Sequence, residues 1–257
     1  MVRILFALAC VAFAPAAAAA ADGYFDASGV KLHYVTLGTG EPVVLIHGLY
    51  SSEKMNWELP GIVKRLATRY EVIALDMPGH GLSDKPDQAD AYGLAMVEDV
   101  VRLLDHLKIR KAHVVGYSMG GMIVMKLLAT HPDRVASALV GGMGWMREGT
   151  ELADFWERMQ NGGRGQTPAV CAQNLGKLSL SAEELKSIRV PTLIVVGEFD
   201  PVRQLYVEPL KKARPDLPIS VVSNTGHMDT VMSLAFKDAI EKWLRQAPSS
   251  RRPSTWW

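Results

Sequence analysis

Short apolar runs separated by amphipathic segments make up most of the chain. These runs lack the polar–apolar alternation of a half-exposed strand, and they cover residues 43–47, 71–76, 112–116, 136–141 and 191–197. Continuous runs of this kind are typical of strands buried on both faces of a parallel sheet. A further strand is predicted over residues 219–223, and two alternating runs within residues 24–37 predict an antiparallel hairpin at a sheet edge.

Helical patterns lie between these runs. The clearest covers residues 97–107, where apolar side chains recur on one stripe. Another covers residues 119–131 and stops before Pro132, and the last covers residues 230–245. Strands that alternate with helices predict an α/β fold, with a mostly parallel twisted sheet and helices on both of its faces.

The alternating pattern is interrupted once and ends before the last residues. Residues 145–188 carry only weak helical pieces, so we interpret them as a short helical lid inserted into an α/β core of residues 22–144 and 189–246. Residues 247–257 are rich in Pro, Ser and Arg, which predicts a disordered tail.

The first residues have the composition of an export signal. Arg3 precedes an apolar run, which is followed by Pro15 and a tract of alanines up to Ala21. This arrangement predicts a cleavable signal peptide over residues 1–21 and a periplasmic or secreted protein. The alternatives are lipid attachment at Cys10 and a retained anchor, for which the alanine-rich second half is a poor bilayer span.

Composition narrows the classes of function. The 257-residue chain has 28 Lys and Arg, 27 Asp and Glu, and two cysteines. Removal of residues 1–21 takes away Arg3 and Cys10, which leaves balanced charge and Cys171 alone, so no intrachain disulfide can form. Balanced charge gives no reason to expect nucleic-acid binding, and no Cys or His cluster has the spacing of metal ligands. We expect no metal and no stable membrane insertion after cleavage; the oligomeric state is left open.

One motif at a predicted strand–helix junction carries candidate chemistry. Residues 116–120 read GYSMG, a G-x-S-x-G motif directly after the strand at 112–116. In this context the serine is held on a strained turn with its hydroxyl above the sheet. Small flanking residues avoid clashes between crowded backbone segments. Ser118 is therefore the candidate nucleophile.

A serine hydroxyl needs a base, and the base needs a carboxylate that orients it. In this architecture the acid follows the serine along the chain and the histidine comes last. Asp200 and His227 fit that order, and each follows the carboxyl end of a predicted strand. Glu198 is the rival acid, and we prefer Asp200 because it lies in the turn itself.

Two backbone donors are expected to bind the oxyanion that develops during attack. One is the N–H of Met119, the residue after the nucleophile, and the other comes from the loop after the first long strand. That loop reads HGLY over residues 47–50, and we choose Leu49 N–H, with Tyr50 as the second choice.

These segments together resemble a known family. VVLIHGL (43–49), DMPGHGLS (76–83), VVGYSMGG (114–121), GEFDP (197–201) and a GH pair before the last helix are similar to α/β-hydrolases of the esterase, haloperoxidase-like and C–C hydrolase group. The resemblance covers about residues 23–245 and implies the fold and the triad rather than a substrate. It also implies that the segment 76–83 is structural, so Asp76 and His80 are not counted as catalytic. The bulky Tyr50 departs from the small residue often found there.

An apolar set near the start of the lid could cover Ser118. Methionine and aromatic side chains adapt to acyl or aryl groups, although the same residues could simply form the core of the lid. The candidate pocket residues are Tyr50, Met143, Trp145, Met146, Phe155, Trp156, Met159 and Met228. Four histidines are expected to be capping or surface residues, and Asp99 to lie on a solvated helix face; these histidines are His33, His106, His113 and His131.

The sequence favours an exported serine hydrolase: a carboxylesterase that acts on small or medium esters through an acyl-enzyme, without a cofactor. Serine at position 118 argues against the dehalogenase and epoxide hydrolase branches, which need a carboxylate nucleophile. A C–C bond hydrolase, a lactonase and a cofactor-free perhydrolase use the same triad and stay open. The alternatives of other classes are a catalytically silent receptor for a small ligand and a membrane-tethered protein that keeps its leader.

Overall fold

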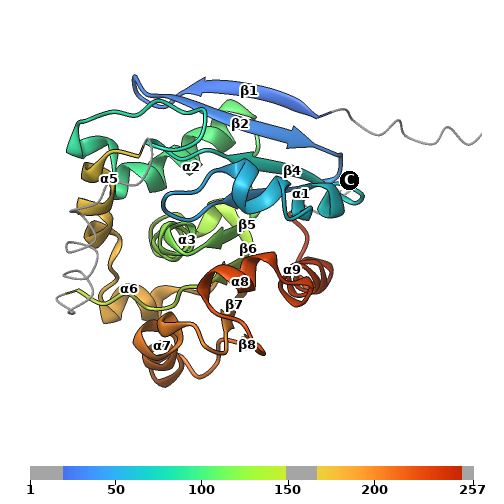
Figure 1. Ribbon diagram of the computed structural model, residues 1–257, viewed down its shortest axis with the longest axis vertical. Coiled ribbons are helices and arrows are strands. Elements are labelled where there is room, and N and C mark those ends of the chain that lie inside the picture. Colours follow the sequence, from blue (N-terminus) through green and yellow to red (C-terminus); the bar gives the residue numbers. More distant parts are fainter. Residues whose placement is uncertain (1–19, 149–166, 251–257) are drawn as a thin grey trace, which may run out of the picture.

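The computed structural model describes residues 20–148 and 167–250. Within them, one sheet has the strand order β1-β2-β4-β3-β5-β6-β7-β8 (Figure 1). The strands are β1 (Ala21–Asp26), β2 (Lys31–Leu37), β3 (Glu41–Ile46), β4 (Tyr70–Leu75), β5 (Ala112–Tyr117), β6 (Val135–Gly141), β7 (Thr192–Gly197) and β8 (Ile219–Val222). The pairs β1–β2 and β2–β4 are antiparallel, and all other neighbours are parallel. The predicted hairpin edge and the buried parallel strands are confirmed.

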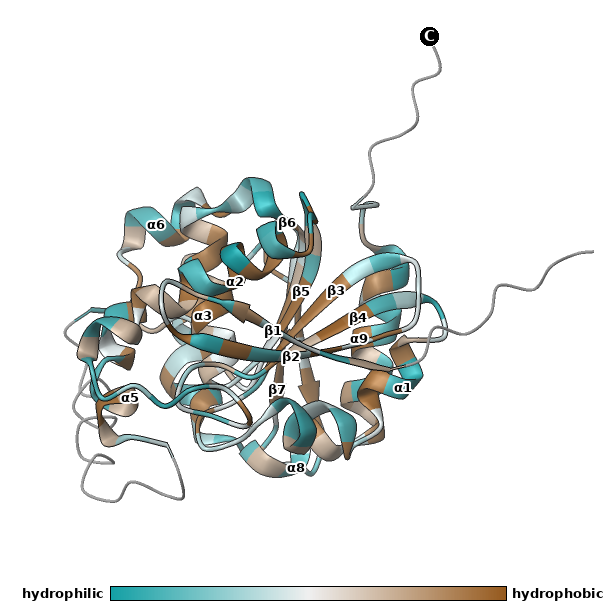
Figure 2. Cartoon of the chain, turned by 90° about the horizontal axis from the view of Figure 1, so that it is seen from above, coloured by the Kyte–Doolittle hydropathy of each residue, from teal (hydrophilic) through white to brown (hydrophobic). Residues whose placement is uncertain are grey.

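Helices cover both faces of the sheet (Figures 1 and 2). On one face, α1 (Ile62–Leu66) and α9 (Leu234–Gln246) bury their apolar sides, and on the other α2 (Leu94–His106) and α3 (Met119–Thr130) do so. Neighbouring residues of β3 supply both cores: Val44 packs with α2 and α3, and Val43 packs with α1 and α9. This two-sided burial explains why the strands read as continuous apolar runs.

Shorter helices form the connections between these elements. They are η1 (Lys54–Glu58), η2 (Ala89–Ala91), η3 (Pro132–Arg134), η6 (Arg203–Val207), α7 (Glu208–Ala213) and α8 (His227–Met232). The predicted last helix is wrong in one respect, because α8 and α9 are separate. Ser233 breaks the helix with an extended backbone, and its hydroxyl caps α9 by accepting from Phe236 N–H at 3.1 Å.

The described part of the predicted lid contains α5 (Ala169–Gln173), η5 (Leu175–Leu178) and α6 (Ala182–Ser187). A capping box starts α6, with Ser181 and Glu184 exchanging hydrogen bonds. Lys126 of α3 ties this segment to the core, since its Nζ donates to Glu184 Oε1 at 2.5 Å and to Ser179 O at 3.1 Å.

Both ends of the described chain contact residues of the sheet. Ala21, at the predicted cleavage position, is the first residue of β1 and lies opposite Thr36. At the other end, Ser249 Oγ and Ser250 N–H of the predicted tail donate to the Glu41 carboxylate. No helix within the described ranges is long and apolar enough to cross a bilayer.

Candidate active site

Ser118 lies on the sharp turn between β5 and α3. Its φ is +54°, in the left-handed region that non-glycine residues seldom adopt. The turn brings backbone segments very close together: a Cβ at Gly116 would lie 2.2 Å from Gly120 O, and a Cβ at Gly120 would lie 2.0 Å from Ile46 O. Glycine at both flanks therefore permits the turn. The Ser118 side chain is recessed, since the residue is 8% exposed.

Three side chains from the segments that follow β5, β7 and β8 form one hydrogen-bonded chain. His227 Nε2 lies 2.9 Å from Ser118 Oγ, and His227 Nδ1 lies 2.7 Å from Asp200 Oδ2. With Nδ1 protonated toward the carboxylate, Nε2 keeps a lone pair that can accept the serine proton. The structure thus brings Ser118, Asp200 and His227 together with the bonding pattern that activates a serine hydroxyl.

The two acids of the loop after β7 have different partners. Asp200 is 2% exposed, and its Oδ1 accepts from Val202 N–H at 2.9 Å, which fixes the carboxylate while Oδ2 faces His227. Glu198 instead accepts from Asn224 N–H at 2.9 Å and secures a neighbouring turn. The geometry therefore favours Asp200 over Glu198 as the partner of His227.

Tyr117 holds the backbone of His227 in place, a contact that the sequence reasoning missed. Its hydroxyl donates to His227 O, and the two ring centroids are 5.5 Å apart. Tyr117 is fully within the core, and burial raises the pKa of its phenol, so the hydroxyl stays a donor. Its position next to the nucleophile in the motif was the only signal in the sequence.

The loop after β3 passes directly beside Ser118. A Cβ at Gly48 would lie 3.4 Å from Ser118 Cβ. Gly48 N–H donates to Asn56 Oδ1 at 3.1 Å, and Tyr50 N–H donates to His80 Nε2 at 3.1 Å. Between these two, Leu49 N–H has no acceptor within the described residues. This pattern favours Leu49 over Tyr50 as the free donor of the loop.

The second predicted donor stands at the start of α3. Met119 is the first residue of that helix, and the first N–H groups of a helix lack intrahelical acceptors. The positive end of the helix dipole adds to the attraction for a negative oxygen at this point. Met119 N–H and Leu49 N–H therefore both come from backbone next to Ser118.

A neutral imidazole fixes each end of this loop. His80 Nδ1 lies 3.0 Å from Pro78 O and donates to it, which leaves Nε2 as the acceptor for Tyr50 N–H. Burial lowers the pKa of His80 to about 3, and the adjacent His47 lowers it further. Burial also lowers the pKa of His47, against the attraction of Asp76. His80 therefore keeps its acceptor lone pair throughout the neutral range.

His47 bridges the loop to the segment after β4. Its Nδ1 donates to Gly48 O at 2.8 Å, and its Nε2 accepts from Met77 N–H at 3.1 Å. Asn56, His47 and His80 are thus three side chains that fix the candidate oxyanion loop. Sequence reasoning placed His80 in a structural segment and missed Asn56, which lies in η1 and contacts a residue eight positions earlier.

Asp76 anchors the layer beneath this loop. It accepts from Glu53 N–H at 2.8 Å, from Leu82 N–H at 3.0 Å and from His33 Nδ1 at 2.9 Å. Burial opposes its charge, but His47 and these donors outweigh burial and lower the pKa of Asp76. For Glu53, burial and then the nearby Asp76 raise the pKa to about 7.

The expectation that all four remaining histidines lie at the surface or cap helices is wrong for two of them. His33 and His113 are each 1% exposed. His113 lies between two polar partners, Ser137 Oγ at 2.8 Å and Glu41 Oε2 at 3.0 Å. Both histidines lie in strands of the sheet, where neighbouring strands and helices bury their side chains, so each needs a buried polar partner.

The candidate pocket residues fall into different places. Met143 and Met146 are buried in the main core, and Trp145 lines a hollow with Arg147, Pro209, Lys212 and Ala213. Tyr50 is half-buried, and Met228 is 70% exposed next to His227. Phe155, Trp156 and Met159 lie outside the described residues.

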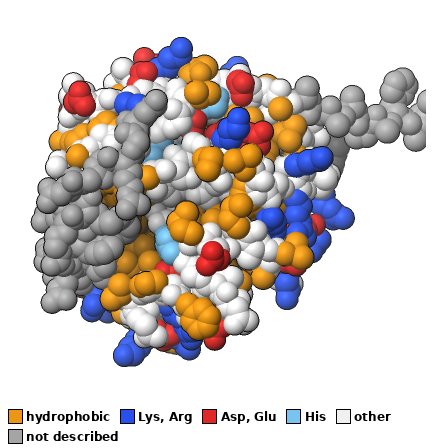
Figure 3. Space-filling model, viewed as in Figure 1, with side chains coloured by type: hydrophobic (Ala, Val, Ile, Leu, Met, Phe, Trp, Pro, Cys, Tyr) orange, Lys and Arg blue, Asp and Glu red, His pale blue; other side chains and the backbone are white. Residues whose placement is uncertain are grey.

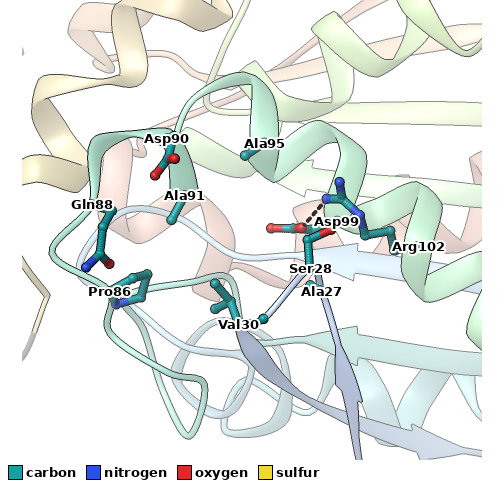
Figure 4. A pocket seen from close by; sticks show the side chains of 11 residues that line it. Ala27, Ser28, Val30, Pro86, Gln88, Asp90, Ala91, Ala95, Asp99 and Arg102 are labelled. Carbon is teal, nitrogen blue, oxygen red and sulfur yellow. Dashed lines mark hydrogen bonds and ion pairs between the residues drawn. The ribbon is translucent and has the colours of Figure 1, made fainter.

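A separate hollow of about 340 Å³ lies between the β1–β2 turn, the loop at 86–91 and α2 (Figure 4). Asp99 lines it and is 4% exposed, so the expected solvated position is wrong. The hairpin turn and the loop close over this side of α2. Burial raises the pKa of Asp99 to about 7, although Arg102 Nη1 donates to it at 2.8 Å.

No group of three His, Cys, Asp or Glu placed to hold a metal ion occurs in residues 20–148 and 167–250.

Comparisons with known proteins agree with this architecture. Residues 41–184 match the family model described as the alpha/beta hydrolase fold. The chain is 36% identical over 242 residues to 2-hydroxymuconate semialdehyde hydrolase of Pseudomonas sp. (strain CF600), covering 86% of this chain and 82% of that protein. The solved structure of E-2-(acetamidomethylene)succinate hydrolase is similar with a TM-score of 0.74, at 22% identity, over 88% of this chain and all of that one.

Another relative shares only a part of its length with this chain. It is the dihydrolipoyllysine-residue acetyltransferase component of the acetoin cleaving system of Cupriavidus necator, 41% identical over 130 residues. That match covers 50% of this chain, which spans about a third of the relative's own length.

Proposed function

The chain belongs to the α/β-hydrolase family and is an enzyme of that type; from this premise we propose that it is an exported serine carboxylesterase. The observation that carries the proposal is the hydrogen-bonded chain Ser118–His227–Asp200, with contacts of 2.9 and 2.7 Å. An intact chain of this kind argues against a silent receptor, which needs no activated nucleophile.

Attack begins at the Ser118 hydroxyl. Ser118 Oγ adds to the carbonyl carbon of the ester while its proton passes to His227 Nε2. Asp200 Oδ2, buried and bonded to His227 Nδ1, stabilises the imidazolium and keeps the ring in one orientation. Tyr117 fixes the backbone at the same histidine. Proton transfer therefore occurs along a contact that the folded chain already makes.

The carbonyl oxygen becomes negative as the tetrahedral intermediate forms. Met119 N–H and Leu49 N–H donate to it, aided by the start of α3. Asn56 and His80 engage the neighbouring N–H groups and so leave Leu49 as the donor that faces the reaction.

Collapse of the intermediate returns the proton from His227 to the leaving alcohol and leaves an acyl group on Ser118. Water, deprotonated by His227, then attacks the acyl-enzyme by the same route, and the carboxylic acid departs. The steps balance without a metal or an organic cofactor. The proposed site of action is the periplasm or the exterior, because residues 1–21 have the pattern of a signal peptide.

A second candidate is hydrolysis of a C–C bond by the same triad. It is favoured by the likeness to a relative whose name specifies 2-hydroxymuconate semialdehyde, a carbonyl compound rather than an ester. Because the triad serves both reactions, assays with both substrate classes are needed to separate them.

The test compares the purified mature protein with Ser118→Ala. Each is assayed on p-nitrophenyl esters from acetate to decanoate and, in parallel, on 2-hydroxymuconate semialdehyde. Ester turnover that disappears in Ser118→Ala supports the esterase. Turnover of the semialdehyde alone would support the second candidate and reject the first.

A further inference from the structure

The most exposed large apolar side chains gather at one edge of the sheet. Among the described residues, six such side chains are between 58% and 70% exposed: Met55, Leu59, Leu82, Phe199, Met228 and Leu234. Five of the six lie between a parallel strand (β3, β4, β7 or β8) and the next long helix, and Leu234 is the first residue of α9, which follows β8 and α8. We call these six residues the apolar rim.

The apolar rim shares its chain segments with the candidate active site. The same connections carry Leu49, Asp200 and His227, and Phe199 and Met228 are the direct neighbours of the latter two. Figure 3 shows hydrophobic side chains gathered around exposed histidine on the face that carries α8. Ser118 itself is recessed, at 8% exposed, while the rim residues beside the triad loops are open to solvent.

Such a concentration needs a physical reason. Single exposed hydrophobic residues are normal, but a contiguous exposed apolar patch marks a surface that binds something. The two exposed large hydrophobics that lie within strands, Tyr24 and Val221, are only 43% and 41% exposed. Among the described large hydrophobics, the strongest exposure therefore falls in the segments that also carry the candidate active site.

The charges interspersed with the rim identify the kind of surface it fits. They are of both signs, without an excess of basic residues: Lys54, Lys85 and Arg203 against Glu58, Asp84, Glu198 and Asp229. An anionic membrane would be matched by an excess of Lys and Arg, which its negative surface potential attracts. The rim lacks that excess, so a neutral or zwitterionic lipid surface is its complement.

We propose that the apolar rim docks the enzyme on a neutral lipid–water surface, so that its substrates are esters with long apolar chains held in lipid aggregates. The substrate part of this inference rests on the proposed esterase. The chain of the ester leaves the lipid between the rim residues, and its carbonyl carbon reaches Ser118 without exposure of the chain to water.

The docking step is tested without catalysis. Ser118→Ala protein is sedimented with phosphatidylcholine vesicles, alone and with Met55→Gln and Leu59→Gln added, and with Val221→Gln as the matched control. We expect Ser118→Ala to bind, the rim pair to lower the partition coefficient by about tenfold or more because two apolar side chains no longer enter lipid, and the control to bind as before.

The substrate preference is tested in the active protein. The rim pair should lower the rate on aggregated p-nitrophenyl decanoate relative to soluble acetate by about tenfold, and Val221→Gln should leave this ratio unchanged. An unchanged ratio in the rim pair, or no vesicle binding by Ser118→Ala, would overturn the inference while the esterase stands. A dimer that the rim pair dissociates, without vesicle binding, would also overturn it. Absence of all ester turnover would reject the esterase, and vesicle binding would still decide the docking.

Discussion

Replacing Asn56 with leucine isolates the support of the candidate oxyanion loop. The side chains have nearly the same shape, but leucine lacks the Oδ1 that accepts Gly48 N–H at 3.1 Å. Asn56 Nδ2 has no partner within the described residues, so its loss breaks no other described contact. The substitution therefore removes one hydrogen bond next to Ser118.

The magnitude follows from the burial of that bond. Asn56 is 5% exposed, so Gly48 N–H is left without solvent as well as without its acceptor. A buried donor left unpaired costs about 1–3 kcal/mol, which corresponds to a fall in Tm of roughly 3–10 °C for a chain of this size. If Gly48 N–H turns to find a partner, Leu49 N–H moves with it, and loss of one oxyanion donor costs about 100- to 1,000-fold in kcat. Partial displacement of Leu49 N–H should therefore lower kcat by about 10- to 100-fold.

The assay separates catalysis from stability. We expect kcat on p-nitrophenyl acetate to fall by about 10- to 100-fold in Asn56→Leu at a temperature well below its Tm, with KM within about threefold. Ser52→Ala is the matched control, since it removes the exposed bond from Met55 N–H in the same segment. A lowered Tm with unchanged kcat would refute the role in the oxyanion loop.

Three further predictions concern other groups. Asp200→Asn should keep the fold and lower kcat by about ten-thousandfold, because the amide favours the wrong tautomer of His227; a loss of only a few-fold would assign the role to another carboxylate. Glu53 has its pKa raised to about 7 by burial, so the stability it contributes in protonated form is lost as pH rises from its ordinary 4.5 through 7. Glu53→Gln should therefore raise the unfolding free energy at pH 8 by up to about 3 kcal/mol, and Tm with it, and should change neither much at pH 4. Equal Tm shifts at both pH values would contradict this. Deletion of residues 248–257 removes Ser249 and Ser250, two of the partners of Glu41, and should lower Tm by a few degrees without changing kcat, whereas an unchanged Tm would show that these two contacts contribute nothing.

The fold was largely predictable because its strands are buried on both faces. Periodicity identified the parallel strands, the hairpin edge and the long helices, and the structure confirms them. The break at Ser233 was missed because the apolar pattern continues through α8 and α9, while a single hydroxyl cap decides where the second helix begins. His33, His113 and Asp99 were misplaced because their burial depends on partners or covering segments distant in sequence.

The site divides in a similar way. Ser118, Asp200 and His227 could be located because each stands at the carboxyl end of a strand, in an order that the fold dictates. Asn56, Tyr117 and the acceptor role of His80 depend on tertiary contacts that no local pattern encodes. Backbone donors such as Leu49 N–H become distinct only when the partners of their neighbours are known.

The most direct test of the central claim is to label the nucleophile with an inhibitor that reacts covalently with activated serines. The mature protein is treated with diisopropyl fluorophosphate, digested and analysed by mass spectrometry, beside His227→Ala. We predict stoichiometric phosphorylation of Ser118 with loss of esterase activity, and labelling slowed by several orders of magnitude in His227→Ala, since the base that activates the hydroxyl is absent. Labelling at another residue, or equal labelling in His227→Ala, would contradict the assignment of Ser118 and His227.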